Sequence, residues 1–378
     1  MLEALDITGF RKYKEFSLKN LGMINCITGA NNVGKTSLLE AVYIWSCGQN
    51  VVPVLLAPLA RERYPGLQNP FWLMDELLTM FYNRHTIPLK MSFCGTYNRR
   101  KVSFEHTVYP SDILTDYDSS YGTFSDDIIS SANSQIPENI QPLLPAEIIR
   151  SGGIRAFAKW IINSSENDEM SYDITVPILQ GSYTKPFCLA KFIDVISHIS
   201  IAENIKIYSL LKREKQLGSF VEELRKVFPE IAGIDMLPYP DASQSPISVE
   251  KTDGRMLPLY AYGDGVQKWF YVLGAMFLHK GSVICIDEID TGFHPAAQVN
   301  FCKNMIESAM KNNVQVFITT HNIEFIDNFL KAASDINDNL LKSIRIITLR
   351  ERGMNVVART LNASEAAEAR EEFALELR

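Results

Sequence analysis

The sequence lacks any stretch of about eighteen uncharged apolar residues, the length that a membrane-spanning helix needs. Acidic and polar residues near its start leave no apolar segment of the kind found in secretory signal peptides. It also has no Cys-x-x-Cys pair. Its scattered cysteines lie mostly in apolar runs, as buried thiols of a reducing compartment do: Cys26, Cys47, Cys94, Cys188, Cys285 and Cys302. We therefore expect a cytoplasmic protein that does not enter a membrane.

An excess of positive charge is also missing. The 37 Lys and Arg residues are outnumbered by 44 Asp and Glu residues, so the formal net charge is -7. This balance argues against a constitutively basic nucleic-acid binder, although a local basic groove stays open because binding depends on a patch. With 378 residues, 46% of them hydrophobic, the chain is long enough for one or two globular domains.

Strand and helix patterns alternate at both ends of the chain and change in between. Residues 51–250 combine proline breaks, alternating strands, a polar stretch at 110–140 and helices. We therefore predict an α/β core made of 1–50 and 251–378, split by an α+β insertion at 51–250. The predicted strands are 2–7, 16–28, two within 88–109, 172–179, 282–286, 314–319, 343–349 and 354–360; the predicted helices are 35–47, 71–82, 187–212, 214–227, 265–279, 295–310, 322–332 and 363–376.

The strongest motif is Gly-x-x-x-x-Gly-Lys-Thr at Gly29–Thr36, between a predicted strand and a predicted helix. Glycines let such a loop fold tightly enough for its N–H groups to surround phosphate oxygens, and the helix N-terminus adds partial positive charge. Lys35 is then expected to reach the β- and γ-phosphates of ATP, and the Thr36 hydroxyl to bind Mg²⁺. The predicted nucleotide-binding residues are Gly29, Ala30, Asn31, Asn32, Val33, Gly34, Lys35, Thr36 and Ser37.

Two adjacent acids, Asp287 and Glu288, follow the apolar strand Val283–Ile286. Open α/β sheets bind ligands at the carboxyl ends of their strands, so these carboxylates are placed to act on the nucleotide. We expect Asp287 to hold Mg²⁺ and Glu288 to polarise an attacking water. Together with the phosphate loop, the pair favours a hydrolase over a protein that only holds nucleotide.

Two weaker motifs complete the set. Gly263-Asp264-Gly265 precedes a predicted helix and forms a second anion-binding N-terminus, which suggests that a partner subunit offers it across a dimer interface. A plain turn with a helix cap is the alternative. His321 ends a predicted strand, where an imidazole can contact the γ-phosphate or the water, or merely cap the strand. The remaining histidines are interpreted as surface or satisfied core residues, for example His85, His106, His198 and His279.

In this order and spacing the motifs resemble those of the ABC-type ATPases, and of the soluble branch that holds RecF, the SMC heads and the OLD ATPases. The resemblance implies that Gly29–Thr36 is Walker A, Asp287 and Glu288 are Walker B, Gly263–Gly265 is the signature and His321 the switch histidine. The opening Ile7–Tyr13 is similar to the first strand of these heads. No Q-loop glutamine is identified; Gln49 and Gln68 are candidates.

Departures from the family pattern indicate which branch of the family the chain resembles. The signature is not Leu-Ser-Gly-Gly-Gln, which disfavours a transporter, and His294 stands where transporters carry aspartate, as in OLD-type ATPases. No long coiled coil interrupts the chain, and few residues follow 350, so we expect no Toprim nuclease module. The chain thus resembles ATPase subunits of anti-phage systems in which a separate, nuclease-like effector acts.

Three hypotheses follow. The first is an Mg²⁺-dependent ATPase that works as a homodimer or higher homo-oligomer, with 51–250 sensing a trigger or holding the effector. The second is an ATP-gated scaffold with negligible turnover. The third is a RecF-like DNA-repair ATPase, whose candidate DNA contacts are Lys90, Arg99, Arg100, Lys101, Lys212, Arg213 and Lys215.

Overall fold

The computed structural model describes residues 1–47, 79–82, 89–110, 154–162, 166–173, 188–237 and 245–373. It divides the chain into two compact units. Unit 1 comprises Met1–Asn20, Glu40–Cys188 and Glu351–Val357, and unit 2 comprises Leu21–Leu39, Leu189–Arg350 and Ala358–Arg378. This division differs from the predicted split at 50 and 250. Among the described residues, no helix is both long and apolar enough to cross a membrane.

Unit 1 contains an antiparallel sheet of six strands. The hairpin predicted within 88–109 is confirmed, and its turn residues Asn98 and Arg99 both have positive φ, at 48° and 64°, as a two-residue hairpin requires. Trp45 is fully buried and donates a hydrogen bond to the carbonyl of Val102 at 3.1 Å. In sheet order the strands are β2 (Tyr13–Leu18), β1 (Leu2–Phe10), β4 (Leu89–Tyr97), β5 (Arg100–Pro110), β6 (Ile154–Ile162) and β7 (Glu166–Asp173).

Unit 2 is built on a second six-stranded sheet, in which β14, β3, β13, β12 and β8 pair in parallel. Parallel strands that are buried on both faces are mostly apolar, and β12 and β13 are both fully buried. The strands in order are β15 (Asn355–Asn362), β14 (Ile344–Arg352), β3 (Ile24–Gly29), β13 (Gln315–Thr319), β12 (Val283–Ile286) and β8 (Ala190–Ile193).

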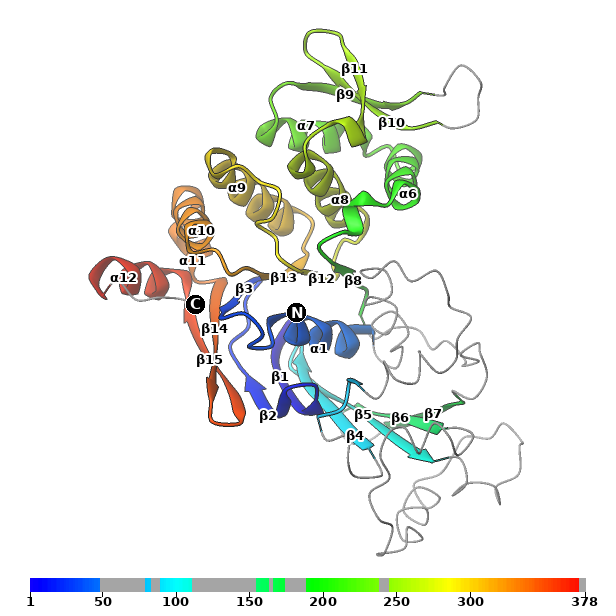
Figure 1. The fold of residues 1–378 in the computed structure, drawn as a ribbon, viewed down its shortest axis with the longest axis vertical. Coiled ribbons are helices and arrows are strands. Elements are labelled where there is room, and N and C mark those ends of the chain that lie inside the picture. The colour runs from blue at the N-terminus through cyan, green and yellow to red at the C-terminus, as the bar shows by residue number, and fades with distance from the viewer. Residues whose placement is uncertain are drawn as a thin grey trace, which may run out of the picture. The chain divides into compact units, whose positions relative to one another are not determined.

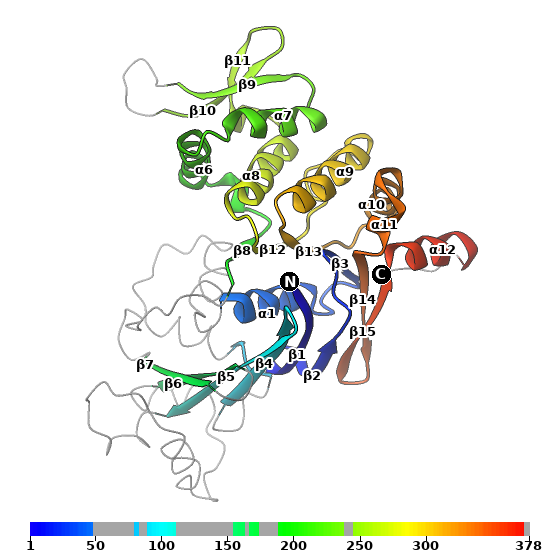
Figure 2. The same cartoon turned by 180° about the vertical axis from the view of Figure 1, so that it is seen from behind.

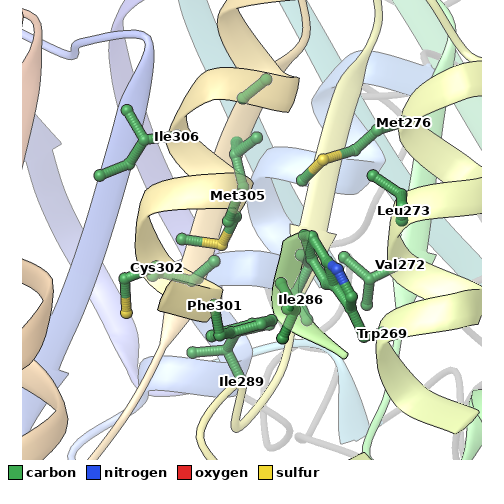
Figure 3. Close-up of a cluster of buried hydrophobic side chains, with 14 of the residues drawn as sticks. Trp269, Val272, Leu273, Met276, Ile286, Ile289, Phe301, Cys302, Met305 and Ile306 are labelled. Carbon is green, nitrogen blue, oxygen red and sulfur yellow. The ribbon is translucent and has the colours of Figure 1, made fainter. Parts of the chain in front are cut away.

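Helices α8 (Asp264–Leu278), α9 (Pro295–Lys311) and α10 (Ile323–Ile336) lie along one face of this sheet (Figures 1 and 2). Figure 3 shows Trp269 of α8 and Phe301 of α9 next to Ile286 of β12. The rings of Trp269 and Phe301 meet edge to face, with centroids 4.7 Å apart. The remaining helices are α1 (Lys35–Cys47), α6 (Ile201–Arg213), α7 (Leu217–Val227), α11 (Asp338–Leu341) and α12 (Ala363–Phe373), and a small sheet is formed by β9 (Ile231–Met236), β10 (Ile247–Lys251) and β11 (Met256–Pro258).

Two predicted elements are each divided in the structure. The helix predicted at 187–212 begins only at Ile201, because Ser200 caps it by accepting a hydrogen bond from the N–H of Glu203. The residues before it form β8, which pairs with β12 at the sheet edge, and the 3-10 helix η2 (Ser197–Ile199). The strand predicted at 16–28 is interrupted, since Asn20 has a positive φ of 58° and β3 starts at Ile24.

Several predictions fall wholly or partly outside the described residues. They are the polar stretch at 110–140, the two Q-loop candidates, most of the helix at 71–82 and the strand at 172–179 beyond Asp173. The described part of that strand belongs to β7, which begins earlier than predicted, at Glu166.

Candidate nucleotide site

The predicted site residues of unit 2 come together because three neighbouring strands run parallel. β13 lies between β3 and β12, with Thr319 beside Ile27 and Ile318 beside Ile286. Parallel strands end at the same edge of a sheet, which is where α/β proteins bind their ligands. The phosphate loop after β3, the two acids after β12 and the residues after β13 therefore share one edge.

The phosphate loop has the backbone that its glycines permit. Gly29, Asn32 and Gly34 have positive φ angles of 146°, 61° and 114°. A Cβ added at Gly29 would stand 2.7 Å from the carbonyl oxygen of Leu349, so the first glycine is also required by close packing. The side chains of Ala30 and Asn31 are exposed, whereas Val33 is buried beneath the loop.

Lys35 opens α1 and folds back over this loop. Its Nζ lies 2.8 Å from the carbonyl oxygen of Gly29 and 2.9 Å from that of Ala30. Burial lowers the pKa of Lys35, while the carboxylates of Glu288, Asp287 and Asp290 act in the opposite direction and favour the charged form. The ammonium is thus held between the loop and the acids that follow β12.

Thr36 and Asp287, the two predicted magnesium ligands, are in contact. The Thr36 hydroxyl lies 3.1 and 3.0 Å from the two carboxylate oxygens of Asp287, which is 4% exposed. Hydroxyl and carboxylate oxygens are the hard donors that Mg²⁺ takes from proteins, alongside water and phosphate oxygens. These two side chains therefore fit the metal that the sequence implies.

Thr319, which the sequence analysis did not single out, joins both Walker B acids. Its hydroxyl donates to Asp287 Oδ1 at 2.7 Å and accepts the backbone N–H of Glu288 at 2.8 Å. Glu288 has a positive φ of 46°, rare for a glutamate, so its backbone is held in a strained conformation. A threonine directly after the apolar run Val316–Ile318 was the only signal in the sequence.

Replacing Thr319 by valine should therefore lower ATP turnover by about tenfold, because both acids lose a hydrogen-bonding partner. The unfolding free energy should fall by about 1–2 kcal/mol, since Asp287 is buried. Thr319→Ser keeps the hydroxyl and is the matched control. Steady-state phosphate release and urea unfolding measure the two effects; a fully active Thr319→Val would contradict this role.

The predicted signature residues, Gly263–Gly265, lie at the start of α8. Gly263 caps the helix without a side-chain hydrogen bond, and Asp264 is half exposed. His198 of η2, which the sequence analysis treated as a surface or satisfied core residue, is 2% exposed, and its Nε2 lies 2.5 Å from Asp264 Oδ1. Its Nδ1 is buried and has no hydrogen-bonding partner among the residues that the structure describes. His198 is thus a core residue, one of the two interpretations offered for it, and it contacts Asp264 at the start of α8.

His321 lies two residues beyond β13 and is exposed. Hydrogen bonds fix the backbone on both sides of His321. The N–H of Thr320 donates to the carbonyl of Ile27 at 3.1 Å, and the Asn322 side chain caps α10 by accepting the N–H of Glu324 at 2.9 Å. His321 thus stands at the site's edge of the sheet, and its part in hydrolysis stays a prediction. His294 is exposed in the turn before α9.

The fold of the chain, a parallel sheet whose strands end in a phosphate loop and a pair of acids, is that of the ABC-type P-loop ATPases. It matches a crystal structure of the Smc head domain from Pyrococcus furiosus, bound to the C-terminal domain of ScpA, with a TM-score of 0.52 at 12% identity; the match covers 99% of each chain. Residues 190–327 match a family described as "AAA domain, putative AbiEii toxin, Type IV TA system".

Two curated proteins are similar in sequence. A protein of Helicobacter pylori named "ATP/GTP phosphatase" is 25% identical over 347 residues, which are 86% of this chain and 87% of that protein. RecF of Idiomarina loihiensis, a DNA replication and repair protein, is 40% identical over 65 residues, which are 17% of this chain and 18% of RecF. The chain thus has the fold of the ABC-type P-loop ATPases, and the names of these two relatives point toward different roles.

Proposed function

We propose that this chain is an Mg²⁺-dependent ATPase that dimerises around ATP and switches a separate effector protein. The observation that carries the proposal is the contact between Thr36 and Asp287, which joins the phosphate loop to the acid pair after β12. A protein that only held nucleotide would need the loop, but not a second acid, Glu288, directly beside the metal ligand.

The chain's own residues bind and orient the phosphates. N–H groups of Gly29–Thr36 surround the β- and γ-phosphates, and Lys35 exchanges its carbonyl partners for phosphate oxygens. Thr36 and Asp287 would hold Mg²⁺, which supplies charge neutralisation at the phosphate oxygens when bound. Glu288 accepts a hydrogen bond from the attacking water, and His321 donates to the γ-phosphate.

Dimerisation is proposed because the signature loop faces solvent. Gly263 and Asp264 are exposed at the start of a 15-residue helix whose N-terminus carries partial positive charge. A second copy can place its ATP γ-phosphate on this end and so complete each site across a two-fold interface.

The test measures phosphate release and sedimentation of the purified chain with ATP and Mg²⁺. We expect turnover per chain to rise with protein concentration, and a dimer to form with ATP but not with ADP. Turnover independent of concentration, with a monomer throughout, would contradict the dimer. If no phosphate is released, the chain is not an ATPase, and the hypothesis of an ATP-gated scaffold replaces the proposed function.

The effector is proposed to act in anti-phage defence. The resemblance of the motifs to OLD-type ATPases supports this, and the family that matches residues 190–327 carries a toxin system in its description. Phage should then form fewer plaques on cells that carry the chain with its neighbouring genes than on cells that carry the same genes with Lys35→Ala. Equal plaque counts would contradict the defence role, and a neighbouring membrane permease would favour transport instead.

A RecF-like role in DNA repair is the second candidate, favoured by the 40% identity over 65 residues with RecF. In unit 1, Arg99 is exposed on the turn between β4 and β5, and Arg100 and Lys101 are exposed at the start of β5. In unit 2, Lys212 instead pairs with Asp235 at 3.5 Å. DNA affinity that falls steeply with salt, and falls further in Arg99→Ala/Arg100→Ala, would support this candidate; a flat salt response would exclude it.

A further inference from the structure

A buried lysine, Lys268, lies one turn after Asp264 on α8 and is 0% exposed. Apolar residues follow it directly in the helix sequence, from Trp269 to Phe277. An ammonium group in such a place is destabilising unless each of its N–H groups finds a partner. Its hydrogen bonds therefore show what holds it there.

All three partners belong to the turn that follows Walker B. Lys268 Nζ donates to the carbonyl oxygen of Glu288 at 2.6 Å, to Thr291 Oγ1 at 2.5 Å and to the Thr291 carbonyl at 3.3 Å. Thr291 closes the same turn, because its hydroxyl and its N–H reach the Glu288 carbonyl at 2.9 and 3.2 Å. The lysine thus fixes the backbone at the strained φ of Glu288.

The signature loop touches this turn as well. A Cβ added at Gly265 would stand 2.7 Å from the carbonyl oxygen of Gly292, so the start of α8 and the end of the turn are in close backbone contact. Gly292 has a positive φ of 84° and faces the carboxylate of Asp264. Movement of the signature loop therefore cannot leave the 288–292 turn unchanged.

We propose that Lys268 is a positioning residue that couples the signature loop Gly263–Gly265 to Glu288 of the same chain. The proposal rests on the proposed dimeric ATPase. In such a dimer the signature loop contacts the partner's ATP, whereas Glu288 acts on the chain's own ATP. Lys268 then links the two sites: ATP bound at one site determines the backbone conformation of Glu288 at the other. The two sites therefore hydrolyse ATP cooperatively.

The charges around Lys268 give this link a pH signature. Asp264 faces it from α8, and Asp287, Glu288 and Asp290 face it from the segment after β12. Burial lowers the pKa of Lys268 to about 8 in spite of these carboxylates. The three-donor ammonium is present below that pH and is lost as the pH rises through it, so kcat should fall there. Loss of charge at Lys35 would instead weaken ATP binding.

The experiment compares wild type with Lys268→Met and Lys268→Arg, and with Lys331→Met as the control at an exposed lysine of α10. ATP affinity, kcat, the Hill coefficient for ATP and the pH profile of kcat are measured. For Lys268→Met we expect about a tenfold lower kcat, ATP affinity within about twofold, and a Hill coefficient falling from about 2 to about 1. The fall of kcat near pH 8 should be absent from the pH profile of Lys268→Met, and in Lys268→Arg it should occur at a higher pH.

A folded Lys268→Met with the kcat, Hill coefficient and pH limb of wild type would overturn the coupling and leave the proposed function standing. A wild type that hydrolyses no ATP would overturn both. If neither variant folds, the Hill coefficient of wild type decides, because a value near 1 for ATP in the dimer would show that the two sites are not coupled.

Discussion

Replacing Glu288 by glutamine should lower ATP turnover by about 10²–10⁴-fold, the range lost with a general base. Glutamine keeps the size of the side chain and the backbone hydrogen bond to Thr319, so the strained turn persists. It loses the negative charge that polarises water. ATP affinity should stay within a few-fold of wild type, because Lys35 and the phosphate loop are unchanged.

Single-turnover phosphate release and nucleotide titration separate these two quantities. Glu324→Gln, at an exposed glutamate in the first turn of α10, is the matched control and should hydrolyse ATP like wild type. Because bound ATP persists in Glu288→Gln, this variant should also accumulate the ATP-bound dimer. Turnover within tenfold of wild type would show that Glu288 is not the base.

Lys35→Ala should weaken ATP binding by about 10²-fold. The lysine contributes charge-assisted hydrogen bonds to phosphate oxygens, each contributing about 1.5–3 kcal/mol, and a loss of about 3 kcal/mol corresponds to that factor. Among the described residues, its Nζ donates hydrogen bonds only to the carbonyls of Gly29 and Ala30 in the loop itself, so the free energy of unfolding should change little. Titration calorimetry with ATP measures the affinity directly.

Lys331→Ala removes an exposed lysine of α10 and serves as the control for lost charge. Its ATP affinity should equal that of wild type. If Lys35→Ala bound ATP within threefold of wild type, the phosphate-loop assignment would be wrong, whatever its effect on hydrolysis.

The sheet strands and helices next to the site could be predicted because their signals are local. The run Val283–Ile286 is apolar and ends in two acids, and the structure makes it a buried parallel strand. The helix at 35–47 follows a complete phosphate-loop motif and has the predicted bounds. In both places the hydrophobic period and the neighbouring turn residues indicate the same element.

The missed residues depend on contacts between distant parts of the sequence. β8 is a four-residue strand that exists because β12 pairs with it, so its own pattern could be taken for a helix. His198, Lys268 and Thr319 gain their roles only when η2, α8 and β13 meet the residues around Glu288 and Asp264. A polar residue in an apolar run is the one sequence feature that Lys268 and Thr319 share.

The composite site is tested most directly by mixing two inactive variants. Lys35→Ala lacks a working phosphate loop, and Gly263→Glu places a carboxylate where the partner's γ-phosphate is proposed to lie. Gly263 is exposed, and an added Cβ would meet no atom of the described residues within 4 Å, so we expect the fold to tolerate the change. Gly263→Ala is its control. An equal mixture should regain up to about a quarter of wild-type phosphate release, because half of the dimers are mixed and each has one complete site. A mixture no more active than its separate components would contradict a site shared between two chains.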